Sequence, residues 1–234
     1  MTGRPDIAIS LADAARTIDT APSIDDALAA ITRAARVSLP RFEHIGISTI
    51  DHRGRVTTRA ATSEVVKGLD DLQYTLTEGP CVDTLRDQDV VLAPDIRHDG
   101  RWPTFTAQAV ASYDLRSQMA VKLFLDEEGT LGCLNLYSTS TREIDPEDEH
   151  VAEVFAAHAA VALGHAREVD QLRQALQSSR TIGTAIGIVM ERYHLDRERA
   201  FEFLTRASSH ANLKLRDVAA RIVESTEGGD ADRP

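Results

Sequence analysis

The sequence has few cysteines, few aromatic residues and no long apolar run. Its two cysteines, Cys81 and Cys133, are too few for a disulfide framework. No stretch approaches the roughly 18 apolar residues of a transmembrane helix. The first residues include Arg4, Pro5 and Asp6 where a signal peptide would have an apolar segment. These absences predict a cytoplasmic protein that does not bind membranes.

Sequence motifs for catalysis and for metal binding are also missing. We find no Gly-rich phosphate loop, no Ser/His/Asp set and no zinc-binding pattern of cysteines and histidines. His98 has no second histidine or cysteine near it at ligand spacing. We therefore expect a protein that is not an enzyme, with no catalytic residue and no metal site.

Charge is distributed unevenly along the chain. The whole sequence has a net charge of −11, whereas residues 171–224 carry nine Lys and Arg against six Asp and Glu, a net charge of +3. A mildly basic segment on an acidic body is typical of a nucleic-acid-binding output attached to a sensor. Ordinary variation in surface charge is the alternative explanation.

The same segment has the apolar periodicity of three short helices. Asp196 is predicted to be the N-cap of the second helix and Asn212 the N-cap of the third. The expected inward-facing residues are Ile182, Ala185, Ile186, Val189 and Met190, then Ala200, Phe201, Leu204 and Ala207, then Leu215, Val218, Ala219 and Ile222.

Three motifs in this segment occur in order: the run from Ser179 to Met190, the pattern Ala200-Phe201-x-x-Leu204, and the run from Ser208 to Ala219. Together they resemble an ANTAR domain, a three-helix RNA-binding module of bacterial transcription antiterminators. The resemblance implies that the partner is a stem-loop of a nascent transcript. One position departs from the family, which usually has Lys where this chain has Ile186. The change either removes a phosphate-facing cation or extends the apolar stripe.

RNA contacts require polar side chains that point away from the helical core. Lys and Arg would bind phosphates, and Ser and Asn could hydrogen-bond the exposed bases of an RNA loop. Tyr193 is the only aromatic residue that we expect on this surface, which argues against an RRM-type or OB-type stacking surface. The candidate RNA-binding residues are Arg180, Thr184, Arg192, Ser208, Asn212, Lys214 and Arg216.

The middle of the chain has the pattern of an antiparallel sheet. Residues 44–51 and 55–62 predict one hairpin, and residues 117–125 and 130–138 predict a second. Residues 89–93 add a fifth strand. A helix capped by Ser23 and Asp26 precedes them. Strands in hairpins with flanking helices predict an α+β fold.

Four motifs in this region resemble a GAF (PAS-like) domain of the kind found in actinobacterial sensors. They are Glu78-Gly79-Pro80-Cys81, Pro94-Asp95-Ile96, Arg101-Trp102-Pro103 and the strand from Leu131 to Tyr137. The resemblance implies an antiparallel sheet with a pocket for a small-molecule signal. The cofactor or ligand stays unknown, because GAF pockets hold many different molecules or none.

Three residues are candidates for the sensor pocket, and each has a structural alternative. Cys81 lies near a predicted helix start, which favours a reactive thiol, although small cysteines are commonly buried and inert. Asp95 could bind a polar group, but Asp after a strand is first a turn residue. Trp102 could stack on a ligand or fill a lid over the sheet.

The chain is therefore divided into an N-terminal helix (1–22), a GAF-like sensor (23–165), an ANTAR-like module (166–224) and a disordered tail (225–234). A long helix over residues 147–191 is expected to join the two domains. A 4/3-spaced seam from residue 154 to residue 182, half of it polar, favours a homodimer through this helix; a solvated connector is the alternative.

These observations predict a signal-responsive RNA-binding regulator of transcription antitermination. Two alternatives belong to other classes. The first is a thiol redox sensor or an enzyme on the GAF fold that uses Cys81. The second is a DNA-binding regulator, since pairs of short helices also bind duplex DNA.

Overall fold

The protein is described from a computed structural model that covers residues 21–125 and 129–227. The expected helix over residues 1–20 and residues 228–234 of the expected tail lie outside this description. The chain divides into two compact units, Met1–Ala166 and Arg167–Pro234, and each is described by itself.

The N-terminal unit is built on a five-stranded antiparallel sheet with the strand order β2-β1-β5-β4-β3. The α+β class predicted from the sequence is confirmed, and so are all five predicted strands. Their bounds are β1 (His44–Ile50), β2 (Val56–Ala61), β3 (Val90–Ala93), β4 (Ser117–Leu125) and β5 (Gly129–Ser138).

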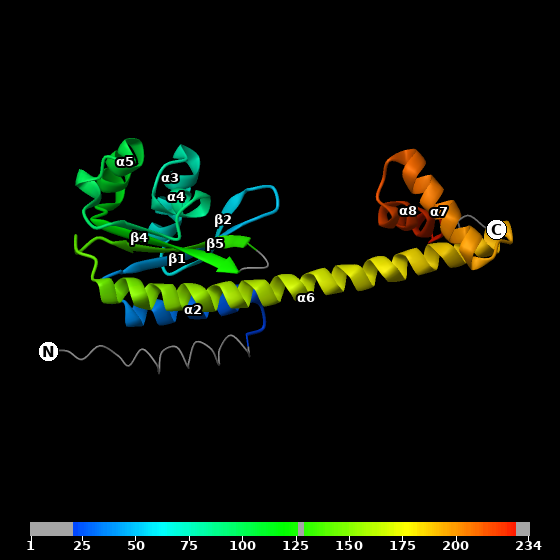
Figure 1. Ribbon diagram of the computed structural model, residues 1–234, viewed down its shortest axis with the longest axis horizontal. Helices are drawn as coiled ribbons and strands as arrows, with labels where there is room; N and C mark the ends of the chain where they lie inside the picture. Colours follow the sequence, from blue (N-terminus) through cyan, green and yellow to red (C-terminus); the bar gives the residue numbers. More distant parts are fainter. Residues whose placement is uncertain (1–20, 126–128, 228–234) are drawn as a thin grey trace. The chain divides into compact units, whose positions relative to one another are not determined.

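Helices cover both faces of this sheet (Figure 1). One face packs against α2 (Ile24–Ser38) and the first part of α6 (Pro146–Tyr193), and this layer forms an apolar core. The other face packs against α3 (Glu64–Leu76), α4 (Pro80–Arg86), η1 (Ile96–His98) and α5 (Pro103–Tyr113). Alternation along β5 separates the two layers, because Leu134 and Leu136 point into the first core while Cys133 and Tyr137 point into the second.

Local chemistry explains where several elements begin. The Ser23 hydroxyl accepts a hydrogen bond from the Asp26 backbone N–H at 3.2 Å, so the predicted cap of α2 is confirmed. The β1–β2 turn is held by Asp51, whose carboxylate accepts from the backbone N–H groups of Arg53 and Arg55. Pro80 is the first residue of α4, where its fixed φ is favourable.

The C-terminal unit consists of the last part of α6, α7 (Arg197–Ala211) and α8 (Leu215–Glu227). Asp196 caps α7 as predicted, with its carboxylate 2.9 Å from the Arg199 backbone nitrogen. The core residues are Ala185, Ile186, Val189, Ala200, Leu204, Val218 and Ala219. One expected core residue was wrong: the Phe201 side chain is 46% exposed, because it lies beside Ala200 on the rim of the inward face.

Asn212 was also predicted incorrectly as the N-cap of the third helix. It is the C-cap of α7 and has a left-handed backbone with φ of 51°. Its N–H donates to the carbonyl groups of Ser208 and Ser209. Asn adopts this conformation more readily than most residues, and α8 begins only at Leu215.

Helix α6 is continuous over 48 residues, close to the predicted range of 147–191. Helix α8 includes residues 225–227, which were expected to belong to the tail. Among the described residues, no helix combines the length and the apolarity that spanning a bilayer requires.

Candidate functional site

The connection between α7 and α8 brings together several of the candidate RNA-binding residues. The Ser208 hydroxyl donates to the Leu213 carbonyl at 2.6 Å, which fixes the loop after the Asn212 cap. The Asn212, Lys214 and Arg216 side chains are exposed beside this bond. Arg216 has one carboxylate neighbour, Asp217, at 3.5 Å. The loop and the first turn of α8 therefore present an amide and two cations to solvent from a fixed backbone.

The three candidates on α6 are exposed but do not form one cluster. The Thr184 hydroxyl donates to the Arg180 carbonyl at 3.1 Å, so it already has one hydrogen bond within the helix. Arg192 lies about 18 Å further along the helix axis than Arg180, at about 1.5 Å per residue. Arg192 shares a groove with Leu213, so it is the α6 candidate nearest to the α7–α8 loop.

Ile186, which stands where the ANTAR family usually has Lys, is a packing residue in the structure. Ile186 is 8% exposed and belongs to the core of the C-terminal unit with Ala185 and Val189. Of the two explanations offered by the sequence, the apolar stripe is the correct one. A side chain in this position contacts α7 and contributes to the stability of the unit.

The aromatic surface of this unit is larger than predicted. Tyr193 does not stand alone, because Phe203 of α7 lies with its ring centroid 5.3 Å away at an angle of 34°. The two residues are 10 positions apart in the sequence. Their contact depends on the turn at His194, which has a left-handed backbone with φ of 51°. The sequence carried no signal for that turn geometry.

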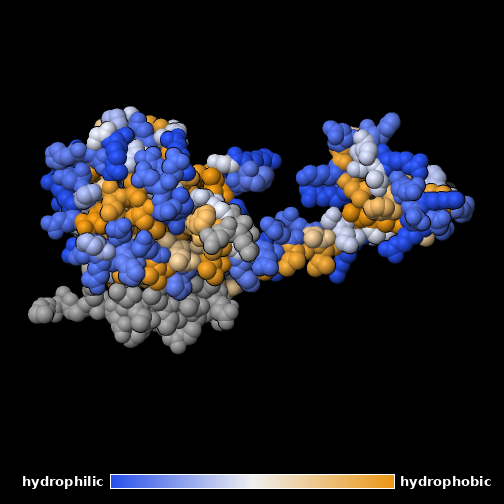
Figure 2. All heavy atoms as spheres, in the orientation of Figure 1, coloured by the Kyte–Doolittle hydropathy of each residue, from blue (hydrophilic) through white to orange (hydrophobic). Residues whose placement is uncertain are grey.

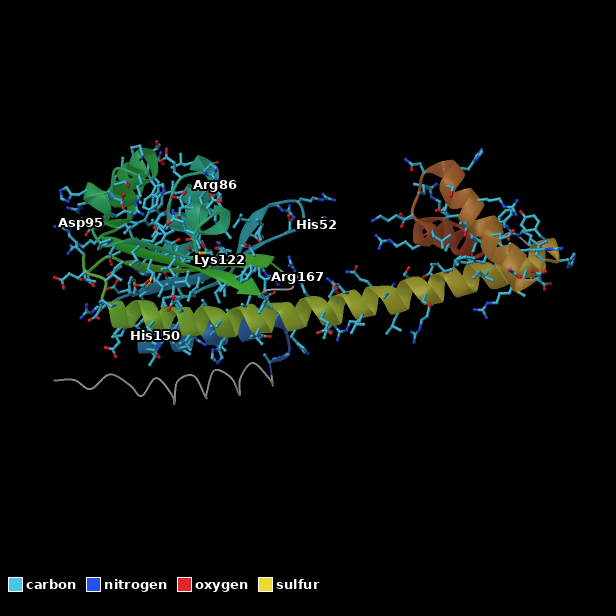
Figure 3. All side chains as sticks on the ribbon, viewed as in Figure 1. His52, Arg86, Asp95, Lys122, His150 and Arg167 are labelled. Atoms are coloured by element: carbon cyan, nitrogen blue, oxygen red, sulfur yellow. The ribbon has the colours of Figure 1, made fainter. Side chains whose placement is uncertain are left out.

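In the N-terminal unit, the three sensor-pocket candidates have different environments. Cys81 is fully buried, and its backbone N–H donates to the Gln73 side chain at 2.9 Å. Trp102 is buried as well, with its indole N–H donating to Asp83 at 2.9 Å. Asp95 lies apart at the edge of the unit (Figure 3), where it binds His98 at 2.9 Å. Cys81 and Trp102 share one core, and Asp95 does not join it.

The centre of that core holds a buried carboxyl group, Asp70 of α3, which is fully shielded from solvent. Thr58 and Asn135 donate to its oxygens at 2.6 Å and 3.0 Å. Ser48 and the Tyr137 hydroxyl donate to it as well. None of the Lys, Arg and His side chains in the described residues forms a hydrogen bond or ion pair with Asp70. The carboxyl group therefore depends on neutral donors.

The network extends from Asp70 to further side chains on α3 and β4. The Gln73 amide donates to the Tyr137 hydroxyl at 2.8 Å and accepts from Gln118 at 3.2 Å. The Gln118 side-chain oxygen is buried and has no partner among the described residues. Tyr74 bonds the Ser48 hydroxyl. Five elements of the N-terminal unit thus contribute polar groups to the same interior.

Burial sets the ionisation of this network. Removal from water raises the pKa of Asp70 to about 6, and the hydrogen bonds from Thr58 and Tyr137 oppose this effect only in part. Burial and the nearby carboxyl also raise the pKa of the Tyr137 hydroxyl. The pKa of the Cys133 thiol is raised well above its usual range by burial and by contact with Cys81. Cys133 is therefore a protonated thiol and a poor nucleophile.

Asp70 and its hydrogen-bond partners were not predicted from the sequence. A signal was present in β5, where the inward side of the second core reads Cys133, Asn135, Tyr137 and the opposite side reads Leu134, Leu136. This alternation shows a polar layer on one face of the sheet. Asp70 itself lies in a helix with no neighbouring motif, so only the fold brings it to the strand.

Two protein families match the sequence. The GAF domain family matches residues 21–164, which is more than half of the chain, so the chain belongs to the GAF family. The ANTAR domain family matches residues 170–223. The protein thus combines a GAF domain with a C-terminal ANTAR domain. No curated protein matches the sequence significantly.

Solved structures support the assignment of the fold. The GAF domain of a phosphoenolpyruvate-protein phosphotransferase from Coxiella burnetii has a TM-score of 0.55 and 16% identity, and the match covers 70% of this chain and 96% of that one. The corresponding Acinetobacter domain has a TM-score of 0.55 and 15% identity, with 73% and 99% covered.

A third similar structure is a type II free methionine-R-sulfoxide reductase from Thermoplasma acidophilum. Its TM-score is 0.51 at 16% identity, and the match covers 61% of this chain and 93% of that one. Identities this low establish the shared fold and leave the chemistry of the site to the residues of this chain.

Proposed function

We propose that this protein is an RNA-binding regulator of transcription antitermination, in which the GAF unit responds to a signal and the ANTAR unit binds a stem-loop of a nascent transcript. The observation that carries the proposal is the match of residues 170–223 to the ANTAR family. The exposed cations Lys214 of the α7–α8 loop and Arg216 of the first turn of α8 support it. When the ANTAR unit holds one stem-loop of the transcript, the competing terminator hairpin does not form.

The proposed RNA surface centres on the α7–α8 loop. Lys214 and Arg216 bind phosphates, and Asn212 hydrogen-bonds an exposed loop base. Ser208 positions this loop through its bond to the Leu213 carbonyl. Arg192, Arg180 and Thr184 of α6 extend the contact along the RNA backbone.

We assign the sensing role to the second core of the GAF unit. Its polar interior around Asp70 is where a small-molecule signal would exchange hydrogen bonds with the protein. The alternative of a reactive thiol at Cys81 is disfavoured, because both cysteines are buried and free. We accordingly propose a regulator and not an enzyme.

The exposed apolar side chains of α6 favour a homodimer. Leu172 and Leu176 are 58% and 63% exposed, and apolar side chains reach the surface along this part of α6 (Figure 2). They follow Val169 at the 3 and 4 spacing of a coiled-coil seam, in a register that shares only Leu172 with the seam expected from the sequence. In a parallel pair with this register, Glu168 faces Arg173 of the second copy. We expect Leu172→Glu with Leu176→Glu to give monomers in light scattering, whereas Gln177→Glu keeps the dimer.

Binding of hairpin RNA tests the main proposal. The purified full chain is titrated with hairpins transcribed from leaders near its own gene and with a DNA duplex of equal charge. We expect tight, loop-dependent RNA binding that Lys214→Ala and Asn212→Gly both weaken. Asn212→Gly is chosen because glycine keeps the left-handed cap. Equal affinity for RNA and DNA that falls steeply with salt would show electrostatics alone and would contradict the proposal.

A further inference from the structure

The C-terminal unit has a groove of about 340 Å³ where its three helices meet. The floor of this groove is apolar. Val189 and Val218 are buried there, and Leu213 and Ile222 are partly covered. Leu213 belongs to the α7–α8 loop, between Asn212 and Lys214. The groove therefore opens beside the residues assigned to RNA, and we refer to it as the aromatic groove.

The aromatic pair stands on the wall of this groove. Tyr193 is 52% exposed and Phe203 is 39% exposed, and both rings line the opening. Large aromatic rings are usually buried, because each carries a substantial apolar area. The two rings are tilted by 34° to each other, so each offers its own exposed apolar face on which a planar group can stack.

The charged residues that line the aromatic groove are all positive. Arg192 of α6 and Arg221 of α8 lie on its rim, and neither forms an ion pair with any residue in 21–125 or 129–226. No Asp or Glu is among the lining residues. The guanidinium groups are therefore available for an anion, and phosphate fits their planar donor geometry.

A second groove on the same unit makes a useful comparison. It lies between α6 and the start of α7 and includes the exposed Phe201, but Arg197 and Glu198 both line it. Its charges balance, and it offers a single aromatic ring. Of these two grooves in the described part of the unit, the aromatic groove alone combines paired rings with uncompensated cations, the combination that binds single-stranded nucleic acid.

We propose that the aromatic groove binds one unpaired base of the RNA loop, stacked on Tyr193 and Phe203, while Arg192 and Arg221 hold the adjoining phosphates. This inference rests on the proposed RNA-binding function and names the part of the RNA that this surface takes. Stacking on a ring is tolerant of base identity, so the groove contributes affinity, and the Asn212 amide contributes discrimination.

A fluorescent base tests this proposal. A hairpin is selected from a random-loop library for tight binding to the full chain, and each loop base is replaced in turn by 2-aminopurine. Stacking on an aromatic ring changes the emission of this base. We expect one loop position to respond when the wild-type protein binds.

The response should depend on the rings. Tyr193→Ala and Phe203→Ala should abolish it and weaken binding about 5- to 150-fold, the range expected for loss of one stacked base. Tyr193→Phe should keep the response. Phe201→Ala is the matched control, since it removes an exposed ring of α7 outside the groove. Arg192→Gln and Arg221→Gln should each lower the salt slope of binding by about one and leave the response in place.

The outcomes separate this inference from the proposed function. Tight hairpin binding with no responsive loop base, or with unchanged affinity in Tyr193→Ala, would overturn the stacking site and leave the RNA function standing. If Tyr193→Ala instead dissociates a dimer, the groove is a contact between two copies of the chain, and this result also overturns the stacking site. Failure of the wild-type protein to bind any hairpin would refute the RNA function and the stacking site together.

Discussion

Replacing the buried carboxyl of Asp70 should change how the stability of the GAF unit depends on pH. The pKa of this group is 3.8 in an ordinary setting and about 6 in the folded protein. Between these values the native state binds more protons than the unfolded chain, so stability falls as pH rises through this window. Above about pH 6 this loss of stability is complete. The difference of about two pKa units corresponds to about 3 kcal/mol.

Asp70→Asn removes this titration. We therefore expect the free energy of unfolding of the wild type, relative to Asp70→Asn, to fall by about 3 kcal/mol from pH 3.5 to pH 7. Urea unfolding followed by fluorescence measures it, because the single tryptophan, Trp102, is buried in the same core. Asp71→Asn, on the exposed side of the same helix, is the control and should show no such change.

The sign of this effect decides between two physical terms. Burial favours the neutral acid, whereas the donors from Thr58, Tyr137, Ser48 and Asn135 favour the carboxylate. If the wild type instead gains stability relative to Asp70→Asn as pH rises, the donors outweigh desolvation. That result would refute the claim that desolvation governs the ionisation of an interior acid without a cation.

Substitutions at three further positions test the packing of the two units. Asn212→Ala should lower the free energy of unfolding of the C-terminal unit by about 1 kcal/mol in thermal denaturation, because alanine disfavours the left-handed backbone, while Asn212→Gly should change it by a few tenths. Leu204→Ala should cost about 2–5 kcal/mol and reduce helical circular dichroism without changing Trp102 fluorescence, since Leu204 is fully buried in the other unit. Gly79→Ala should lower the urea midpoint reported by Trp102, because φ is 124° and the new methyl would meet the Gln73 side chain at 2.5 Å. An unchanged midpoint in Gly79→Ala would show that neither the positive φ nor the contact with Gln73 costs stability.

Most of the fold was predictable because its signals are local. Hairpin turns, strand alternation and the caps at Ser23 and Asp196 each depend on a few neighbouring residues. The error at Asn212 has the same origin. An Asn between two helices satisfies the sequence pattern of an N-cap and of a left-handed C-cap equally well. The backbone φ that distinguishes the two caps is not determined by the residue type.

The sites were less predictable because they depend on contacts between distant elements. Asp70 meets Asn135 across 65 positions, and Tyr137 across 67. No periodicity in α3 marks its inward acid. The Tyr193–Phe203 pair needs one specific turn between two helices. In contrast, Cys81 and Trp102 were identified because they lie in short motifs, and the structure places both in the second core of the GAF unit.

The first part of α6 has a consequence for the order in which the chain is made. Val151, Phe155, Ala159 and Leu163 of this helix form one wall of the first core, against a sheet whose strands end by Ser138. During synthesis all five strands are complete before this wall exists, so a nascent GAF unit has only α2 on that face and exposes apolar surface that chaperones can bind. A fusion that exchanges the output module must therefore keep the chain through Leu163, because a cut at the start of α6 would leave that face covered by α2 alone.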